Sequence, residues 1–444
     1  MRDLVITLAV FGSLPFILKR PFIGILMWVW ISVMNPHRLS WGFAYDFPFA
    51  AMIAATTLIG LLTTKDPRRL PMTPVVISLM MFVVWMCITT AFSMWPDESV
   101  VMLNRVLKIM LMTMVTMMLI KTKEQVQYLV WTLVASLAYY GVKGGIFTIT
   151  SGASSIVWGP SGSYIEGNNE VALAFITIIP IMYYIQMVAE NKWVKRGMML
   201  SIILCAFAAL GSYSRGALLG IAAMLFFLWL KSPKKVAMGV VMVCLIPVAI
   251  AFMPDKWGAR MDTIKTYEED QSAMGRINAW YMAFNMAKDR PLVGGGFEIY
   301  NRTAFALYAP VPDDVHAAHS IYFQALGEHG FVGLGLYLTM VWLVWRKTVW
   351  IVRVARERAA LKWAAQLATM IQVSMVGFAV GGAFLSLLYY DVPYYLIAIV
   401  VVLGTIVEKA LKEEKDAKAA LKKASLAAQE PAVEVLAPPA RSTR

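Results

Sequence analysis

Long apolar runs dominate the pattern of hydrophobic and polar positions along this chain. Many of the runs approach the roughly 20 residues that an α-helix needs to cross a bilayer. Because lipid offers no hydrogen-bond partners, such a run must satisfy its own backbone as a helix. The pattern therefore predicts an all-α polytopic membrane protein, with clear spans at 48–62, 74–93, 101–120, 125–147, 170–188, 198–212, 216–230, 236–253, 330–345, 364–388 and 394–408.

The amino-terminal segment allows two interpretations. Within residues 4–35, two short apolar stretches flank Lys19-Arg20-Pro21, and they fit either one broken span or a tight hairpin. We therefore expect about 12 transmembrane helices, or one more if the hairpin forms. The run from Met1 to Leu18 lacks a clear cleavage site, and its basic residues follow it, so we interpret it as part of the mature protein.

The spans divide the chain into four parts. Residues 1–253 are predicted to be transmembrane helices with short loops, and residues 330–408 the C-terminal transmembrane helices. Between them, residues 254–329 form one large hydrophilic loop that we expect to contain short helices. The tail, 409–444, is typical of a short charged helix followed by a disordered segment, and we expect it to be dispensable for chemistry.

Basic residues determine the predicted orientation, because short loops rich in Lys and Arg stay in the cytoplasm. The opposite loops, 94–100, 148–169 and 389–393, contain no Lys or Arg. This orientation predicts a multi-pass protein of the bacterial inner membrane, with a cytoplasmic C-terminus and a periplasmic large loop. The basic loops contain Lys65, Arg68 and Arg69; Lys121 and Lys123; Lys192, Lys195 and Arg196; Lys231, Lys234 and Lys235; and the run from Arg346 to Lys362.

Composition supports the membrane class and removes other classes. Of the 444 residues, 59% are hydrophobic and 15% charged, which is too apolar for a soluble protein. From 254 to 320 the large loop holds seven Lys or Arg and nine Asp or Glu, a net charge of −2. The overall charge of +13 is therefore a consequence of topology, and no nucleic-acid partner is predicted. The three cysteines lie inside apolar runs, so we expect neither disulfides nor a cysteine zinc site.

Arg215 is an unusual cation, because it lies on the predicted outer side in the short hairpin GSYSRGA. One interpretation is an arginine that reaches the lipid headgroups. The other is a guanidinium that binds a phosphate, for which its planar fork is well suited. Arg105 and Lys143, in the outer halves of two spans, allow the same two interpretations as snorkelling residues or as substrate-binding cations in a cavity. Arg276 precedes an amphipathic segment that could lie on the membrane surface.

Three of the four histidines cluster in the segment DDVHAAHSIYFQALGEHG. We predict that His319 is a general base that takes a proton from an acceptor hydroxyl, because it stands where the loop runs into an apolar stretch. His316 and His329 fit polar positions at helix ends, and Glu328 could orient a base or face headgroups. Of these three residues, we predict that His316 and Glu328 take part in substrate binding. A metal site at Asp313, Asp314, His316 and His319 is the alternative, although the spacing matches no standard zinc signature.

Other candidate features are weaker. The outer loop 148–169 offers Tyr164 and Asn168 for stacking on sugars and hydrogen bonding to them, although such residues are ordinary in interfacial loops. The glycines of PLVGGGF are only a weak phosphate-loop signal. No P-loop, nucleotide motif or Ser-His-Asp order is present, so we predict no cofactor and no cytosolic energy source.

Several motifs together resemble those of the O-antigen ligase and polymerase superfamily, most closely its exosortase-associated O-glycosylation ligases. They are PFILKRPFIGILMWVWISVMNPHRLSWGF, SYSRGA, GRINAW followed by PLVGGGF, and HSIYFQALGEHGFVGL. The resemblance implies that a glycan moves from undecaprenyl diphosphate onto an acceptor at the periplasmic face, with inversion and without metal. It further implies that Arg215 and Arg276 contact the diphosphate and that His319 activates the acceptor hydroxyl.

The sequence is compatible with more than one acceptor. An O-antigen ligase acting on lipid A-core oligosaccharide is the leading hypothesis, and a polymerase or a protein O-oligosaccharyl ligase would share the same fold. A lipid-linked glycan transporter is the alternative of another class, in which the outer cations would line a vestibule. The chain shows neither the repeat symmetry nor the broken midplane helices common in transporters, which favours the enzyme.

Overall fold

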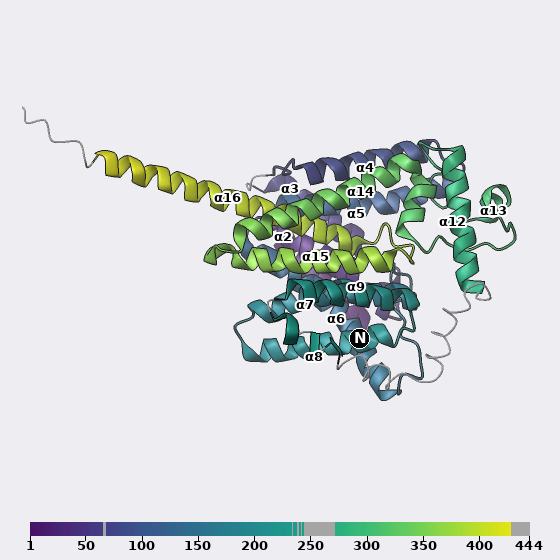
Figure 1. Cartoon of the computed structure of the whole chain (residues 1–444), viewed down its shortest axis with the longest axis horizontal. Coiled ribbons are helices and arrows are strands. Elements are labelled where there is room, and N and C mark those ends of the chain that lie inside the picture. Colours follow the sequence, from purple (N-terminus) through teal and green to yellow (C-terminus); the bar gives the residue numbers. More distant parts are fainter. Residues whose placement is uncertain (65–67, 233, 238, 241, 244–270, 428–444) are drawn as a thin grey trace, which may run out of the picture.

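The structure is a computed structural model that describes residues 1–64, 68–232, 234–237, 239–240, 242–243 and 271–427. Within these ranges the chain forms α-helices with a few short 3₁₀ and π segments and no β-strand. Most of the helices run roughly along one direction and make a bundle, while α12 lies across one end of it (Figure 1). The all-α class predicted from the apolar runs is thus confirmed.

The first helices form a hairpin. The two are α1 (Arg2–Lys19) and α2 (Phe22–Val29), which a π segment (Trp30–Met34) extends. The break falls at Arg20-Pro21, where proline lacks the N–H that a continuing helix needs. Of the two interpretations of residues 4–35, the structure therefore agrees with the hairpin of two helices.

The other helices of the bundle agree with the predicted apolar runs. Seven described helices are long and apolar enough to cross a membrane, and two shorter ones, Phe22–Met34 and Phe49–Thr63, are also apolar. The protein is therefore a multi-pass membrane protein, while the count of about 12 spans stays a prediction, because the run at 236–253 lies largely outside the described residues. The helices are α3 (Phe49–Thr63), α4 (Pro74–Ala91), α5 (Pro96–Leu119), α6 (Lys123–Thr150), α7 (Asn168–Val188), α8 (Lys192–Leu210), α9 (Arg215–Lys231), α14 (Ile321–Ala355), α15 (Lys362–Gly382) and α16 (Asp391–Ala427).

Helix α7, which contacts α6, α8, α9 and α15, is the most enclosed of the seven candidate spans. In its most apolar window 78% of the residues are buried, against 28% for α8. Helix α7 is therefore covered by protein, whereas α8 turns most of its surface outward, as a lipid-facing helix does. Asn168 and Glu170 lie in the first turn of α7, so the most buried of the candidate spans fixes the positions of these two residues.

The predicted large loop contains helices, as expected, but its limits differ from those of the sequence. Helix α12 (Gln271–Asp289) and the short α13 (Arg302–Tyr308) pack around Met282, Met286, Ile299 and Phe305. The last turns of the loop, 321–329, already belong to α14, which continues past a kink at Gly330. Residues 254–270 lie outside the described part of the chain.

The charged tail continues the last helix of the bundle. Helix α16 runs from Asp391 to Ala427, and its C-terminal part projects beyond the bundle at the end away from α12 (Figure 1). The expected charged helix is therefore formed, and it is one helix with the preceding span. The segment from 428 onward, predicted to be disordered, is not among the residues described.

Two of the sequence motifs pair through their backbones. The N–H groups of Gly295 and Gly296, in PLVGGGF, donate to the carbonyls of Gly327 and Glu328, at 2.9 and 3.0 Å. Gly294 has a positive φ of 61°, and a Cβ atom there would meet the Gly327 carbonyl oxygen at 2.4 Å. The glycines therefore allow close contact with α14. Because two of their N–H groups are already used, this turn is not a preformed phosphate cradle.

Candidate active site

The hairpin that carries Arg215 is held in place by the loop before α7. Asn168 donates from Nδ2 to the Ser212 carbonyl at 2.7 Å, and the Val157 N–H donates to the Gly211 carbonyl at 3.1 Å. The hydroxyl of Tyr213 donates to the Ala153 carbonyl. Ser214 caps α9, so Arg215 occupies the first turn and is half-buried. Asn168, predicted to contact sugars, thus has a structural bond that fixes the arginine hairpin.

His319 lies just before α14 in a strained backbone conformation. Its φ is +41°, a region that residues other than glycine adopt uncommonly. The preceding carbonyl, of Ala318, accepts a hydrogen bond from Trp280 Nε1 at 2.7 Å, and the His319 N–H donates to Ser386 Oγ at 2.9 Å. Contacts from α12 on one side and from the segment after α15 on the other thus hold the backbone of His319.

Arg276 and His319 lie close enough for the charge of the guanidinium to act on the imidazole. The structure adds Glu170, whose carboxylate also lies within the field of Arg276. Gly275 packs against His316, since a Cβ on this glycine would meet the ring at 2.3 Å. One half-buried cation from α12 therefore lies near both a carboxylate from the start of α7 and His319 before α14.

The position of Arg215 relative to this group follows from the packing of its neighbours. Gly216 faces Phe384, with 3.0 Å between the Phe384 Cβ and the position of a glycine Cβ. The Phe384 ring lies 6.4 Å from that of Trp280, which is one helical turn after Arg276. Because Ser386 follows Phe384, the arginine hairpin, α12 and His319 all border the same short segment after α15.

The pKa of His319 is lowered to about 4, first because the imidazole is buried and then because Arg276 and His316 repel its charged form. His319 is therefore neutral near pH 7. Its Nδ1 atom is buried and, within the described residues, makes no hydrogen bond. A neutral imidazole with an unused ring nitrogen can accept a proton, which is the chemistry predicted for this residue.

His316 and the neighbouring acidic residues form a pair. Its Nε2 lies 2.7 Å from Asp314 Oδ1, and the Asp314 carbonyl accepts from Asn278 Nδ2 at 3.0 Å. Asp313, which belonged to the predicted metal alternative, is exposed. Among the residues described, no three His, Cys, Asp or Glu side chains come together as a metal site would require.

Arg105 and Tyr164 form a second group. The buried Tyr164 hydroxyl is influenced by the Arg105 guanidinium and by the carboxylates of Asp391 and Glu298, and burial raises its pKa. Tyr164 therefore lies near Arg105 of α5, Asp391 at the start of α16 and Glu298, which follows the glycine-rich turn. Its predicted role with Arg105 in substrate binding stays a prediction.

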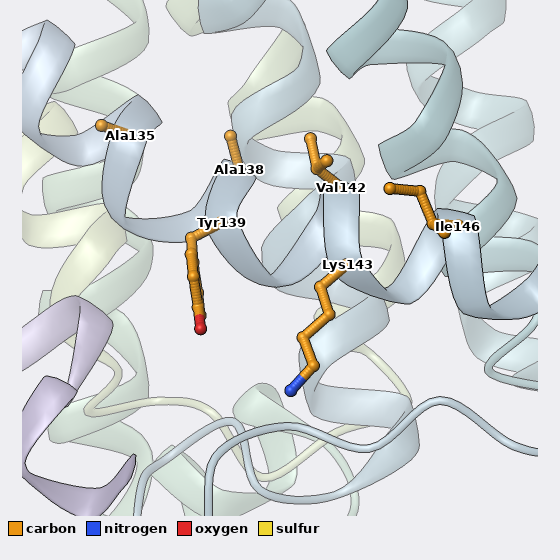
Figure 2. Close-up of a pocket in the computed structure, with 6 residues that line it drawn as sticks. All are labelled: Ala135, Ala138, Tyr139, Val142, Lys143 and Ile146. Carbon is orange, nitrogen blue, oxygen red and sulfur yellow. The ribbon is translucent and has the colours of Figure 1, made fainter. Parts of the chain in front are cut away.

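Lys143 lies away from these residues. It is exposed on α6 and lines an open groove of about 560 Å³ together with Tyr139 and apolar side chains of the same helix (Figure 2). Figure 2 shows Lys143 and Tyr139 pointing to the same side of α6. The structure does not bring Lys143 into contact with Arg276 or His319, so its predicted part in substrate binding would require a separate subsite.

Glu328 and His329 belong to the interior of the protein. The Tyr389 hydroxyl donates to the Glu328 carboxylate and lies 2.6 Å from His329 Nε2, and Thr89 Oγ1 lies 2.8 Å from His329 Nδ1. The Glu328 residue is 4% exposed and His329 is fully buried. Buried polar groups that satisfy each other in this way stabilise a specific packing, so we interpret this trio as a structural anchor.

Sequence reasoning missed Glu170 at the site and two residues that support it, Ser386 and Tyr389. Glu170 follows Asn168 and Asn169, and an acidic residue is common in the first turn of a helix, so its position gave no functional signal. Ser386 and Tyr389 lie at the end of a predicted span, where serine and tyrosine are ordinary. The absence of Lys and Arg from 389–393 was the only signal, and it indicated topology.

The fold and the site together define a multi-pass helical membrane protein with arginines and a histidine gathered at one end of its bundle. Residues 200–338 match the O-antigen ligase family, and residues 1–190 match a family of unknown function (DUF5935). No curated protein matches the chain. The first match supports the O-antigen ligase and polymerase superfamily that the motifs predict. Arg215, Arg276 and His319 all fall within residues 200–338.

Proposed function

We propose that the protein is a glycosyltransferase that moves a polysaccharide from undecaprenyl diphosphate to lipid A-core oligosaccharide on the periplasmic face of the inner membrane. The observation that supports this proposal best is a buried His319 whose Nδ1 makes no hydrogen bond among the described residues, within the electrostatic field of the Arg276 guanidinium. Proteins of the superfamily are glycosyltransferase-like ligases and polymerases. The donor, the acceptor and the residue roles are parts of the proposal.

The reaction needs few protein groups. His319 takes the proton of the acceptor hydroxyl as its oxygen attacks the anomeric carbon, and the bond from that carbon to the diphosphate oxygen breaks with inversion. The electron pair leaves with the diphosphate, whose growing charge Arg276 and Arg215 stabilise. Because the diphosphate is already a good leaving group, positioning and charge stabilisation account for most of the catalysis.

The acceptor is tested with a deletion strain. Loss of the polymer band from lipopolysaccharide on gels, restored by the wild-type gene, is expected for a lipid A-core ligase. Unchanged capping with shorter polymers would indicate a polymerase, and unchanged lipopolysaccharide with loss of protein glycosylation would indicate a protein ligase. Purified protein that carries donor across liposome membranes without forming any product would contradict the proposed enzymatic function and indicate a transporter.

The pH dependence of transfer follows from the environment of His319. Because the base must be neutral to accept a proton, kcat/KM is expected to be flat near pH 7 and to fall as the pH drops through about 4. A bound diphosphate adds negative charge near Arg276 and so raises the pKa of His319. As the pH is lowered, kcat should therefore begin to fall at a higher pH than kcat/KM does. Protein incubated at each pH and assayed at pH 7 controls for denaturation. An acid limb of kcat/KM at the ordinary histidine pKa would contradict the buried, cation-flanked base.

Metal removal provides a further test. The proposed reaction neutralises the diphosphate with arginines, so transfer by the purified protein should continue at an unchanged rate in excess EDTA. The control is an assay with added magnesium or manganese ions, which should not increase the rate. A loss of activity in EDTA that a divalent ion restores would revive the metal alternative at Asp313 and Asp314.

A further inference from the structure

Residues 383–390 join α15 to α16, and the Ser386 side chain of this loop accepts a hydrogen bond from the His319 N–H. We propose that Ser386 is a positioning residue, which holds the backbone of His319 in its strained conformation and so keeps the imidazole beside Arg276. This inference rests on the proposed function, because it assumes that His319 is the base. It assigns a role in the reaction to a loop outside the residues that match the ligase family.

The contact itself is specific. The His319 N–H donates to Ser386 Oγ at 2.9 Å, and within the described part of the chain no backbone carbonyl accepts from it. A histidine with φ near +41° costs roughly 1 kcal/mol or more compared with ordinary conformations, so its surroundings must hold it there. The next residue, Ser320, caps α14 and has an extended conformation. A relaxation at His319 would therefore turn the imidazole while α14 stayed in place.

The 383–390 loop is well suited to hold another residue, because it is fixed to α14 at its far end. The Leu388 N–H donates to Gln324 Oε1 at 3.3 Å, and the Leu388 carbonyl accepts from the Tyr394 hydroxyl at 2.9 Å. Tyr389 joins the buried pair Glu328 and His329. Ser386 is thus three residues from an interior anchor, and its hydroxyl has a defined place relative to the start of α14.

The electrostatics of His319 depend on this placement. Its pKa is lowered by burial, by Arg276 and by His316, and each of these effects requires the imidazole to stay where the structure has it. An imidazole that turned toward solvent would recover an ordinary pKa. A change at Ser386 should therefore appear in the pH profile of transfer, in addition to the rate.

The test is Ser386→Ala in the full-length protein, assayed with purified lipid-linked donor and acceptor. We expect kcat to fall roughly tenfold with little change in the KM for donor, because a buried N–H loses its acceptor and the base is misplaced. The acid limb of kcat/KM should move from about pH 4 toward the usual histidine value. Ser386→Thr keeps the hydroxyl and should restore both rate and pH profile.

Ser374→Ala is the matched control. Ser374 is fully buried in α15, and its hydroxyl donates to the Thr177 carbonyl at 2.7 Å, far from His319 in the chain. This variant also loses one buried hydrogen bond, so it should lower thermal stability about as much as Ser386→Ala and leave the acid limb unmoved. The two stabilities are compared by thermal unfolding in detergent.

A double mutant separates this inference from the proposed function. In a His319→Asn background, adding Ser386→Ala should change the residual rate less than twofold, because there is no base left to position. If His319→Asn is inactive but Ser386→Ala has the wild-type rate and pH profile, the positioning role is wrong and the base stands. If His319→Asn is fully active, the proposed function loses its base, whatever Ser386→Ala does.

Discussion

Replacing His319 by asparagine is expected to reduce glycan transfer by roughly 10²–10⁴-fold, the usual contribution of a general base. Among the described residues the buried Nδ1 makes no hydrogen bond, and the lowered pKa keeps the imidazole neutral near pH 7, as the proposed role of general base requires. Asparagine tolerates positive φ better than most residues, so the substitution removes the base while keeping the backbone at +41° accessible. Transfer is measured as single turnovers with donor-saturated protein.

Two comparisons make this result interpretable. His319→Ala should be as inactive as His319→Asn, although it also strains the backbone, and both variants should bind donor with nearly wild-type affinity. His37→Ala is the control for loss of a histidine, since His37 lies in a 3₁₀ segment between α2 and α3 and is outside the proposed site. Transfer by His319→Asn at more than a tenth of the wild-type rate would remove His319 as the general base.

The membrane fold could be read from the sequence because apolar runs have few structural alternatives in lipid. Helices α4 to α9 each lie close to a predicted span. The ambiguity at residues 4–35 had the same origin, since both stretches were too short to span unaided, and packing decides such cases. Gly24 of α2 sits against Thr57 of α3 with no room for a Cβ atom, a contact that no local pattern could indicate.

The sequence pointed to the charged residues of the candidate site but gave no sign of the residues that hold them in place. Arg215, Arg276 and His319 stood out because cations are rare on the outer side and histidines are rare throughout. Ser386 and Tyr389 act through contacts across more than 60 residues of sequence, with His319, Glu328 and His329. Such contacts depend on tertiary packing, and a serine or tyrosine at the end of a span carries no sign of them.

Arg276→Ala is expected to lower kcat/KM for the lipid-linked donor by about 10²-fold or more, because in the proposed mechanism the guanidinium stabilises charge that grows on the leaving diphosphate. Part of this loss should appear as weaker donor binding, since a diphosphate is charged before the reaction as well. Arg276→Lys should recover only a fraction, because an ammonium lacks the planar fork that binds two phosphate oxygens. Transfer and donor binding are measured separately with purified protein.

The variant has a second expected effect that a general loss of positive charge would not produce. Arg276 is one of the groups that lower the pKa of His319, so its removal should move the acid limb of kcat/KM upward from about pH 4. Lys288→Ala is the matched control, since Lys288 is an exposed cation of the same helix whose amine lies over the Phe284 ring at 5.6 Å. That variant should keep the wild-type profile. Equal effects of the two substitutions would mean that α12 contributes only a general positive field, and the place of Arg276 beside the base would have no part in catalysis.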